Sequence, residues 1–203
     1  MPTLTPRIEP RTLRATAAGL VLVAVVTRMQ LESSMVTHML VQLPLLAIAG
    51  WCLGRTWQSA RATGVTACAL ALVQSCNRGG VTGLVAASFA MLTWMLPRTL
   101  DLARLDVMAD ALKFVSVPAA GLAVALSWPR LPVIARAVVH LEVIATFFRF
   151  GWGYLAAEQR LCLSYLADDQ LRTGQLLLCL GTAYAVAVCW RPLFGSGSPR
   201  TMA

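Results

Sequence analysis

Residues 35–54 read MVTHMLVQLPLLAIAGWCLG and hold no Lys, Arg, Asp or Glu before Arg55 ends the stretch. A helix needs about 20 mostly apolar residues to cross the hydrocarbon core of a bilayer. The stretch meets this requirement, so the sequence predicts a membrane-spanning helix here.

The whole chain shares this apolar character. Of its 203 residues, 58% are hydrophobic and only 13% are charged, and the mean hydropathy is +0.68. Soluble domains carry about 25% charged residues. A chain of this length cannot hide so much apolar surface in one soluble core, which makes the lipid bilayer its natural surroundings. We therefore expect an all-α, polytopic membrane helical bundle that forms one domain over residues 1–203.

Seven segments have the length and hydropathy expected of spanning helices. They are 14–31, 35–54, 60–76, 81–97, 112–128, 131–155 and 172–193. Residues 1–13 form an N-terminal arm, and the Gly- and Ser-rich residues 195–203 form a flexible tail. Residues 98–113 alternate leucines with charged side chains, which indicates either a short amphipathic helix at the membrane surface or a solvated loop.

The cationic residues lie mostly between the apolar segments rather than in a run. This placement indicates membrane orientation rather than nucleic-acid binding, although the net charge is +8. With a cytoplasmic N-terminus, the inner side receives Arg7, Arg11, Arg14, Arg55, Arg61, Arg98, Arg104, Lys113, Arg160 and Arg172, and the outer side receives Arg28, Arg78, Arg130, Arg136, Arg191 and Arg200. Seven spans then place His38 near the outer surface and Asp169 near the inner one.

The N-terminal segment and the cysteines constrain the fold and the cellular compartment only weakly. The arginines before residue 15 and the apolar run after it resemble a signal peptide, but without a clear cleavage site we expect a retained membrane helix. The six cysteines form no CxxC pair and predict neither a disulfide framework nor a zinc site.

The second segment carries the sharpest chemical pattern in the chain. Met35, His38, Met39 and Gln42 follow the spacing of one helix face. Thioethers beside an imidazole are soft donors that favour Cu(I). Pro44 follows and is expected to loosen the helix. The alternative is that the methionines fill core gaps and the histidine bonds a backbone carbonyl.

The sixth segment carries Arg136, His140, Glu142 and Arg149 within one apolar span. Ionisable residues inside a membrane are costly and mark either functional or internally paired positions. One hypothesis is that His140 or Glu142 completes a metal site with His38. The other is a salt bridge inside the bundle without any ligand.

No short catalytic motif is present. The chain has no Walker loop, no GxGxxG and no HExxH, and Asp168 and Asp169 are explained by capping of the last helix. We therefore predict that the protein is not an enzyme.

Two short motifs resemble a known family. His38-Met39 with Gln42 and Pro44-Leu45-Leu46, and then Asp169-Gln170 with Gly174, resemble elements of the CtaG-type cytochrome c oxidase assembly factors. Gln42 stands where that family carries a second histidine, and His140 alone represents a later histidine pair. The resemblance implies a bacterial inner-membrane protein that hands copper to a haem-copper oxidase and that contacts oxidase subunits.

Two functions follow as hypotheses. In the first, the chain is a copper-handling assembly factor in which His38, Met35 and Met39 hold Cu(I), supported by His140 or Glu142. In the second, it is a non-catalytic structural subunit or scaffold of a membrane complex, packed against partners through small residues. Those residues are Gly64, Gly83, Gly121, Gly151 and Gly153.

Overall fold

A computed structural model describes residues 9–59, 68, 71, 75–157 and 159–194. Within these residues the chain is helical and contains no strand. The elements in order are α1 (Pro10–Val26), α2 (Arg28–Leu31), α3 (Met35–Thr37), η1 (His38–Gln42), α4 (Leu43–Ser59), α6 (Val81–Met95), α7 (Pro97–Leu105), α8 (Val107–Ser127), η2 (Trp128–Arg130), α9 (Val133–Ala156) and α10 (Ala167–Phe194). The all-α prediction is therefore confirmed for the part of the chain that the structure describes.

Fewer helices than predicted have the character of membrane spans. Among the described residues, three candidates are long and apolar enough, namely Met35–Gln58, Val107–Arg130 and Asp168–Trp190, and α6 with α7 adds a fourth if this bent pair is one span. The described residues therefore support three or four spans rather than the seven predicted from the sequence. The helix α9 has the length, but Arg136, Glu142 and Arg149 interrupt its apolar surface.

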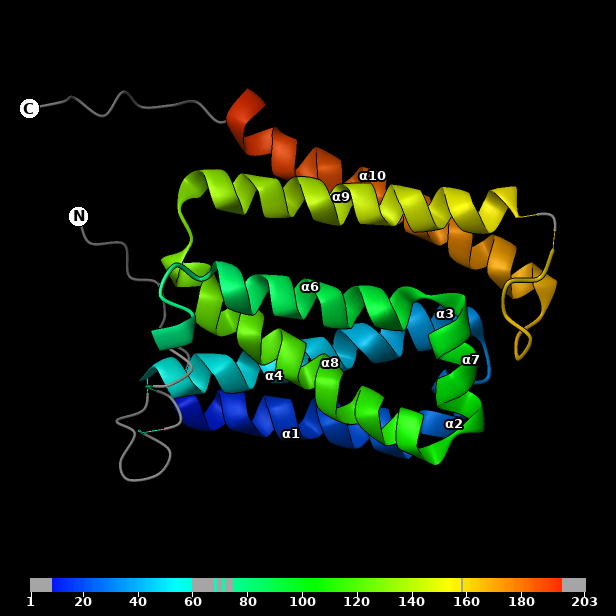
Figure 1. Ribbon diagram of the computed structural model, residues 1–203, viewed down its shortest axis with the longest axis horizontal. Coiled ribbons are helices and arrows are strands. Elements are labelled where there is room, and N and C mark those ends of the chain that lie inside the picture. Colours follow the sequence, from blue (N-terminus) through cyan, green and yellow to red (C-terminus); the bar gives the residue numbers. More distant parts are fainter. Residues whose placement is uncertain (1–8, 60–67, 69–70, 72–74, 158, 195–203) are drawn as a thin grey trace, which may run out of the picture.

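The helices form a main body and a second layer (Figure 1). In the body, α4 packs against both α1 and α8, and α6 packs against the other side of α8. The pair α9 and α10 packs together and lies over α6 in the view of Figure 1. The start of α1 and the end of α10 lie at the same end of the molecule, on the left of that figure. We call this the terminal end, and the other the loop end.

The predicted third span, 60–76, lies mostly outside the described residues, but its flanks are informative. Gln58 donates to the Ala125 carbonyl at 2.6 Å, and Asn77 donates to the Ser127 hydroxyl at 2.8 Å. Both flanks therefore contact the last turn of α8. A single crossing would place them at opposite ends, so the alternation of sides predicted after residue 60 is wrong. Arg78 follows Asn77, Arg130 lies three residues after Ser127 and Arg55 lies three residues before Gln58, so these arginines share one end of the bundle.

Helix boundaries elsewhere differ from the predictions by a few residues. The helix α1 begins at Pro10, inside the predicted arm 1–13, and residues 1–8 and the tail 195–203 lie outside the described residues. The charged stretch 98–113 divides into two parts. Its first part is α7, which bends by 74° from α6. Its second part already belongs to α8, whose start is capped by the Asp106 side chain accepting from the Met108 N–H at 2.7 Å.

Glycines set the close crossing of α4 and α8. A Cβ atom on Gly50 would lie 1.8 Å from the Pro118 carbonyl oxygen, and one on Gly121 would lie 1.9 Å from that of Ala47. No side chain fits at either position, so the two backbones touch directly. This contact fixes the position of Lys113, which lies two turns before Gly121 on α8.

Candidate functional site: a buried ionic ring at the loop end

The π-helix η1 positions the first two side chains of the site. Pro44 has no N–H to offer to the Leu40 carbonyl, and the backbone one turn earlier widens into the π-helix His38–Gln42. The predicted loosening of the helix takes this form. A π-turn brings residues four apart close to one face, and His38 and Gln42 are both fully buried. Widened turns of this kind recur at functional sites.

Lys113 of α8 reaches this pair from the opposite helix. Its Nζ lies 2.6 Å from Glu32 Oε1, 3.0 Å from His38 Nε2 and 3.1 Å from Gln42 Oε1, and it forms a hydrogen bond with each. A fourth acceptor, Asp110 Oδ1, lies 2.9 Å away in an ion pair but receives no hydrogen bond from any described residue. An ammonium has three protons, so one of four acceptors must go without.

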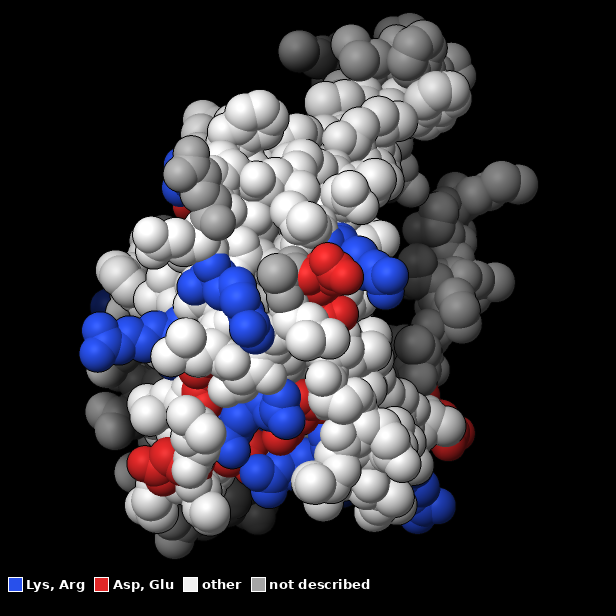
Figure 2. All heavy atoms as spheres, turned by 90° about the vertical axis from the view of Figure 1, so that its right-hand side faces the viewer, with Lys and Arg blue, Asp and Glu red and all other residues white. Residues whose placement is uncertain are grey.

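Arg28 closes the charges into a ring. Its guanidinium lies 3.3 Å from Glu32 and 3.0 Å from Asp110, and both carboxylates also pair with Lys113. Two cations and two anions therefore alternate, and each touches both neighbours of opposite sign. The Lys113 side chain is fully buried, whereas that of Arg28 is 37% exposed. Figure 2 shows charged side chains gathered on this end of the molecule among largely uncharged surroundings.

The ring alters the acidity of Glu32. Burial alone raises the pKa of a carboxyl group, but here the hydrogen bond and charge of Lys113, together with the hydrogen bond from Gln42, outweigh it. The pKa of Glu32 is therefore held below its ordinary value of 4.5. The ionised form of Glu32 is the one that the fold stabilises.

His38 is bonded through both ring nitrogens. Its Nδ1 lies 2.6 Å from the Tyr165 hydroxyl, and its Nε2 lies beside the Lys113 ammonium. An ammonium can only donate, so Nε2 accepts and Nδ1 carries the proton that is donated to Tyr165. Burial raises the pKa of Tyr165 and keeps this phenol neutral. The imidazole has no lone pair left for another partner.

Short contacts with α7 hold the loop that carries Tyr165. The Asp101 carboxylate accepts from the backbone N–H groups of Leu163 and Ser164 at 2.7 and 3.0 Å. Arg104 donates to the Ser164 carbonyl at 3.0 Å, and its guanidinium lies 5.1 Å from the centre of the Tyr165 ring. Burial raises the pKa of the neighbouring Cys162 thiol to about 12, so it remains protonated.

The methionines of the copper hypothesis lie in the core beside the ring. Met35 and Met39 are buried in the main hydrophobic cluster with Leu43 and Leu46. The Tyr154 hydroxyl lies 3.9 Å from the Met39 sulfur and donates to the Met95 carbonyl at 2.7 Å. The two thioethers fill space between helices, as in the alternative considered from the sequence.

His140 and Glu142 occupy a different part of the molecule. His140 bonds the Tyr184 hydroxyl at 2.6 Å and packs edge-on against Trp128, while Glu142 pairs with Arg149 at 3.3 Å. Fourteen residues of α9 separate His140 from Tyr154, which contacts Met39, and this corresponds to about 21 Å of helix. The structure therefore does not bring them to His38.

The arrangement at His38 leaves neither nitrogen of that imidazole free for Cu(I). No group of three or more His, Cys, Asp or Glu side chains in the described part of the chain is placed to hold a metal ion. Both nitrogens of His38 are engaged, and the nearest group is itself a cation. Copper binding stays a prediction that requires Lys113 to move away.

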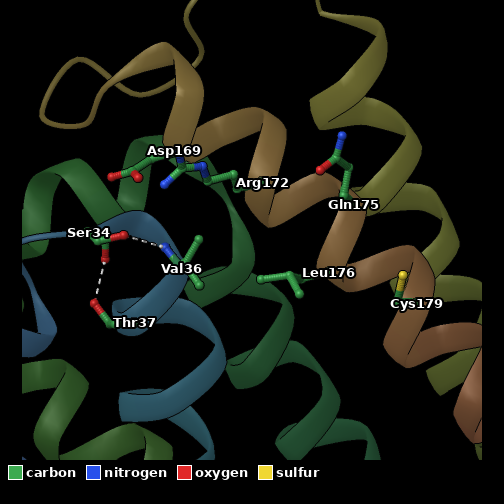
Figure 3. A pocket seen from close by; sticks show the side chains of 8 residues that line it. All are labelled: Ser34, Val36, Thr37, Asp169, Arg172, Gln175, Leu176 and Cys179. Carbon is green, nitrogen blue, oxygen red and sulfur yellow. Dashed lines mark hydrogen bonds between the residues drawn. The ribbon is translucent and has the colours of Figure 1, made fainter.

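The two motifs that resemble the CtaG-type family lie at the same end, contrary to the sides predicted for them. Asp169 and Arg172 of α10 line a surface hollow of about 480 Å³ opposite Ser34 and Thr37, which precede His38 (Figure 3). Gln170 is buried and joins the Leu161 N–H to the Tyr154 carbonyl. At Gly174, α10 approaches the Gly151 carbonyl of α9 closely.

Sequence reasoning missed the residues at the centre of the site. Lys113 was counted only as an orientation charge, and Asp110 and Tyr165 were not singled out. The available signal was the pair Asp110 and Lys113, one helical turn apart at the edge of an apolar segment.

Comparison with known proteins finds no relative of this chain. No family model matches the chain, and no curated protein or solved structure matches it either.

Proposed function

We propose that this protein is a non-catalytic scaffold or structural subunit of a membrane protein complex. One observation carries the proposal: the main concentration of buried charge in the described residues is a ring in which every charge is paired with two of opposite sign. Arg28, Lys113, Glu32 and Asp110 balance in charge, and His38 has both nitrogens occupied. Because its charges are paired with one another, such a ring is better suited to holding helices in place than to binding a substrate.

The ring joins segments that lie far apart in the chain. Lys113 is 81 residues from Glu32, and His38 is 127 residues from Tyr165. It links the α2 end, η1, α8 and the loop before α10. Removing one member of a buried ion pair is strongly destabilising because the other charge stays buried. The ring therefore fixes the relative positions of these segments, as a docking frame requires.

Membrane location and orientation belong to the same proposal. We place the chain in the bacterial cytoplasmic membrane with its N-terminus in the cytoplasm. Arg11 and Arg14 belong to the first turns of α1, which starts at the terminal end, and Arg55, Arg78 and Arg130 lie near the contacts of Gln58 and Asn77 with the last turn of α8. Basic residues next to spanning helices favour the cytoplasmic side.

Mild-detergent extraction from native membranes tests the scaffold function. We expect the wild-type chain to migrate in an assembly larger than its own 21.8 kDa. Lys113→Met breaks the ring and is expected to deplete that assembly, whereas Arg149→Gln removes an exposed pair and is expected to leave it intact. Recovery of the wild-type chain only as a monomer contradicts the proposal.

Copper handling is the second candidate, favoured by the burial of Met35, Met39 and His38 on one side of the same helix. Copper handling predicts that the purified protein binds Cu(I), whereas the scaffold proposal predicts no bound metal. Near-stoichiometric Cu(I) binding that is lost in His38→Ala/Met39→Ala, and kept in the control Met108→Leu at an exposed methionine, supports it. Equal, negligible binding by all three proteins favours the scaffold.

A further inference from the structure

A long apolar groove separates the body from the second layer. It has a volume of about 600 Å³ and lies between α6 and α8 on one side and α9 and α10 on the other. Its walls are mainly aliphatic and aromatic, with Phe89, Met91, Val139 and Phe147 among them. Its acidic wall residue, Glu142, is paired with Arg149. The groove is therefore suited to a hydrocarbon chain.

The length of the groove matches one leaflet of a membrane. Along α9 it extends from Val138 to Phe147, which is about 14 Å of helix. Half of a hydrocarbon core of about 30 Å is about 15 Å. At its far end, the Tyr154 contact with the Met95 carbonyl joins α9 to α6. A chain that enters from the terminal end thus ends near the middle of the bilayer.

Two arginines lie next to Trp128 at one end of the groove: Arg130 belongs to the same short helix η2, and Arg136 contacts the Trp128 ring. Trp128 lines the groove, and the Arg136 guanidinium lies 5.8 Å from the centre of its ring. Arg130 donates to the Leu126 carbonyl and Arg136 to the Pro129 carbonyl, at 2.8 and 3.4 Å. Neither arginine pairs with a carboxylate of the described residues, and Arg136 Nε is buried there without a hydrogen-bond partner.

We propose that the groove binds an anionic phospholipid. One acyl chain lies between α6 and α9, and the phosphate lies against Arg130 and Arg136. Guanidinium groups bind phosphate oxygens through charge-assisted hydrogen bonds, and basic pockets between membrane helices are sites for anionic head groups. A partner helix in the groove accounts for the apolar walls but not for two arginines without a counter-charge.

Quenching of tryptophan fluorescence by brominated acyl chains tests the lipid site. The wild-type protein is reconstituted in phosphatidylcholine vesicles that contain either brominated phosphatidylglycerol or brominated phosphatidylcholine at equal mole fraction. We expect stronger quenching by the anionic lipid, and we expect Trp128→Phe to remove that excess. Equal quenching of the wild-type protein by the two lipids overturns the proposal, because the groove is then filled without regard to charge or by protein.

Charge variants identify the head-group contacts. Arg130→Gln/Arg136→Gln is expected to abolish the excess quenching, with an apparent affinity lower by about fivefold for each arginine lost. Arg11→Gln, at an exposed cation on α1 at the same end, is the control and is expected to keep it. Excess quenching that survives in the double variant contradicts the site. If that variant does not fold, the Arg130→Lys/Arg136→Lys protein and the salt dependence of wild-type quenching decide instead, and unchanged selectivity at high salt counts against the proposal.

Discussion

Lys113 is the residue on which most of the buried contacts of the loop end converge. Its side chain is fully buried, and those of its partners Glu32 and Asp110 belong to residues that are only 5% and 4% exposed. The energetic asymmetry of such groups is large. A buried pair contributes little beyond well-packed apolar residues, but half of a pair is costly because the remaining charge has no solvent.

We expect Lys113→Met to lower the free energy of unfolding by about 3–5 kcal/mol. The methionine fills a similar volume but leaves two buried carboxylates facing one arginine. Thermal unfolding in detergent measures the change. The matched control is Arg149→Gln at the exposed pair with Glu142, for which we expect about 0–1 kcal/mol. Equal effects of the two substitutions would show that the ring is no more than a surface feature.

The lowered pKa of Glu32 makes stability depend on pH in a defined direction. Its folded-state pKa lies below the ordinary 4.5, so its contribution is complete above pH 4.5 and is lost as the pH falls through the folded-state value. We expect the unfolding midpoint to fall as the pH is lowered below 4.5. In Glu32→Gln this acid-dependent part is expected to disappear, and an unchanged pH profile contradicts the role of Glu32.

At the scale of the helices, the crossing of α4 and α8 depends on two glycines. We expect Gly50→Ala and Gly121→Ala each to destabilise the protein by several kcal/mol, because each added Cβ would overlap a backbone carbonyl. Gly153→Ala in α9 is the control, since nothing lies within 4 Å of its added Cβ. There we expect a gain of about 0.5–1 kcal/mol from helix propensity. Thermal unfolding of the three variants checks the order.

Helices were predictable from the sequence where hydropathy and helix breakers agree. Pro97 and Leu131-Pro132 mark real helix ends, and the apolar stretch from Met35 lies in a long helix. The loosened turn before Pro44 was also predictable, because a missing N–H is a local property. The return of the chain to one end between Gln58 and Asn77 was not, since hydropathy measures how apolar a segment is and not where its flanks contact other helices.

The site was predictable only in part, for the same reason. The spacing of Met35, His38 and Met39 indicated one buried face, and these residues are buried. The partners of His38 come from 75 and 127 residues away, and no local pattern announces them. The sequence indicated His38 as a metal ligand. In the structure its Nε2 bonds Lys113 and its Nδ1 bonds Tyr165.

At the scale of the whole molecule, the start of α1 and the end of α10 lie on one side of the bundle (Figure 1). We expect reporters fused before α1 and after α10 to be found in the same compartment. A cysteine placed at Leu163, which is 83% exposed at the loop end, is expected to be labelled from the opposite side in an otherwise cysteine-free chain. Reporters in different compartments would restore an odd number of spans.

Three N–H donors of Lys113 face four acceptors, so more than one hydrogen-bond arrangement is available at the loop end. Rotation of the –NH3⁺ group about its terminal C–N bond redirects its three N–H groups among Glu32, His38, Gln42 and Asp110. Whichever acceptor is omitted, the nitrogen stays where it is and the helices need not shift. The ring can thus redistribute its hydrogen bonds while its heavy atoms keep their positions.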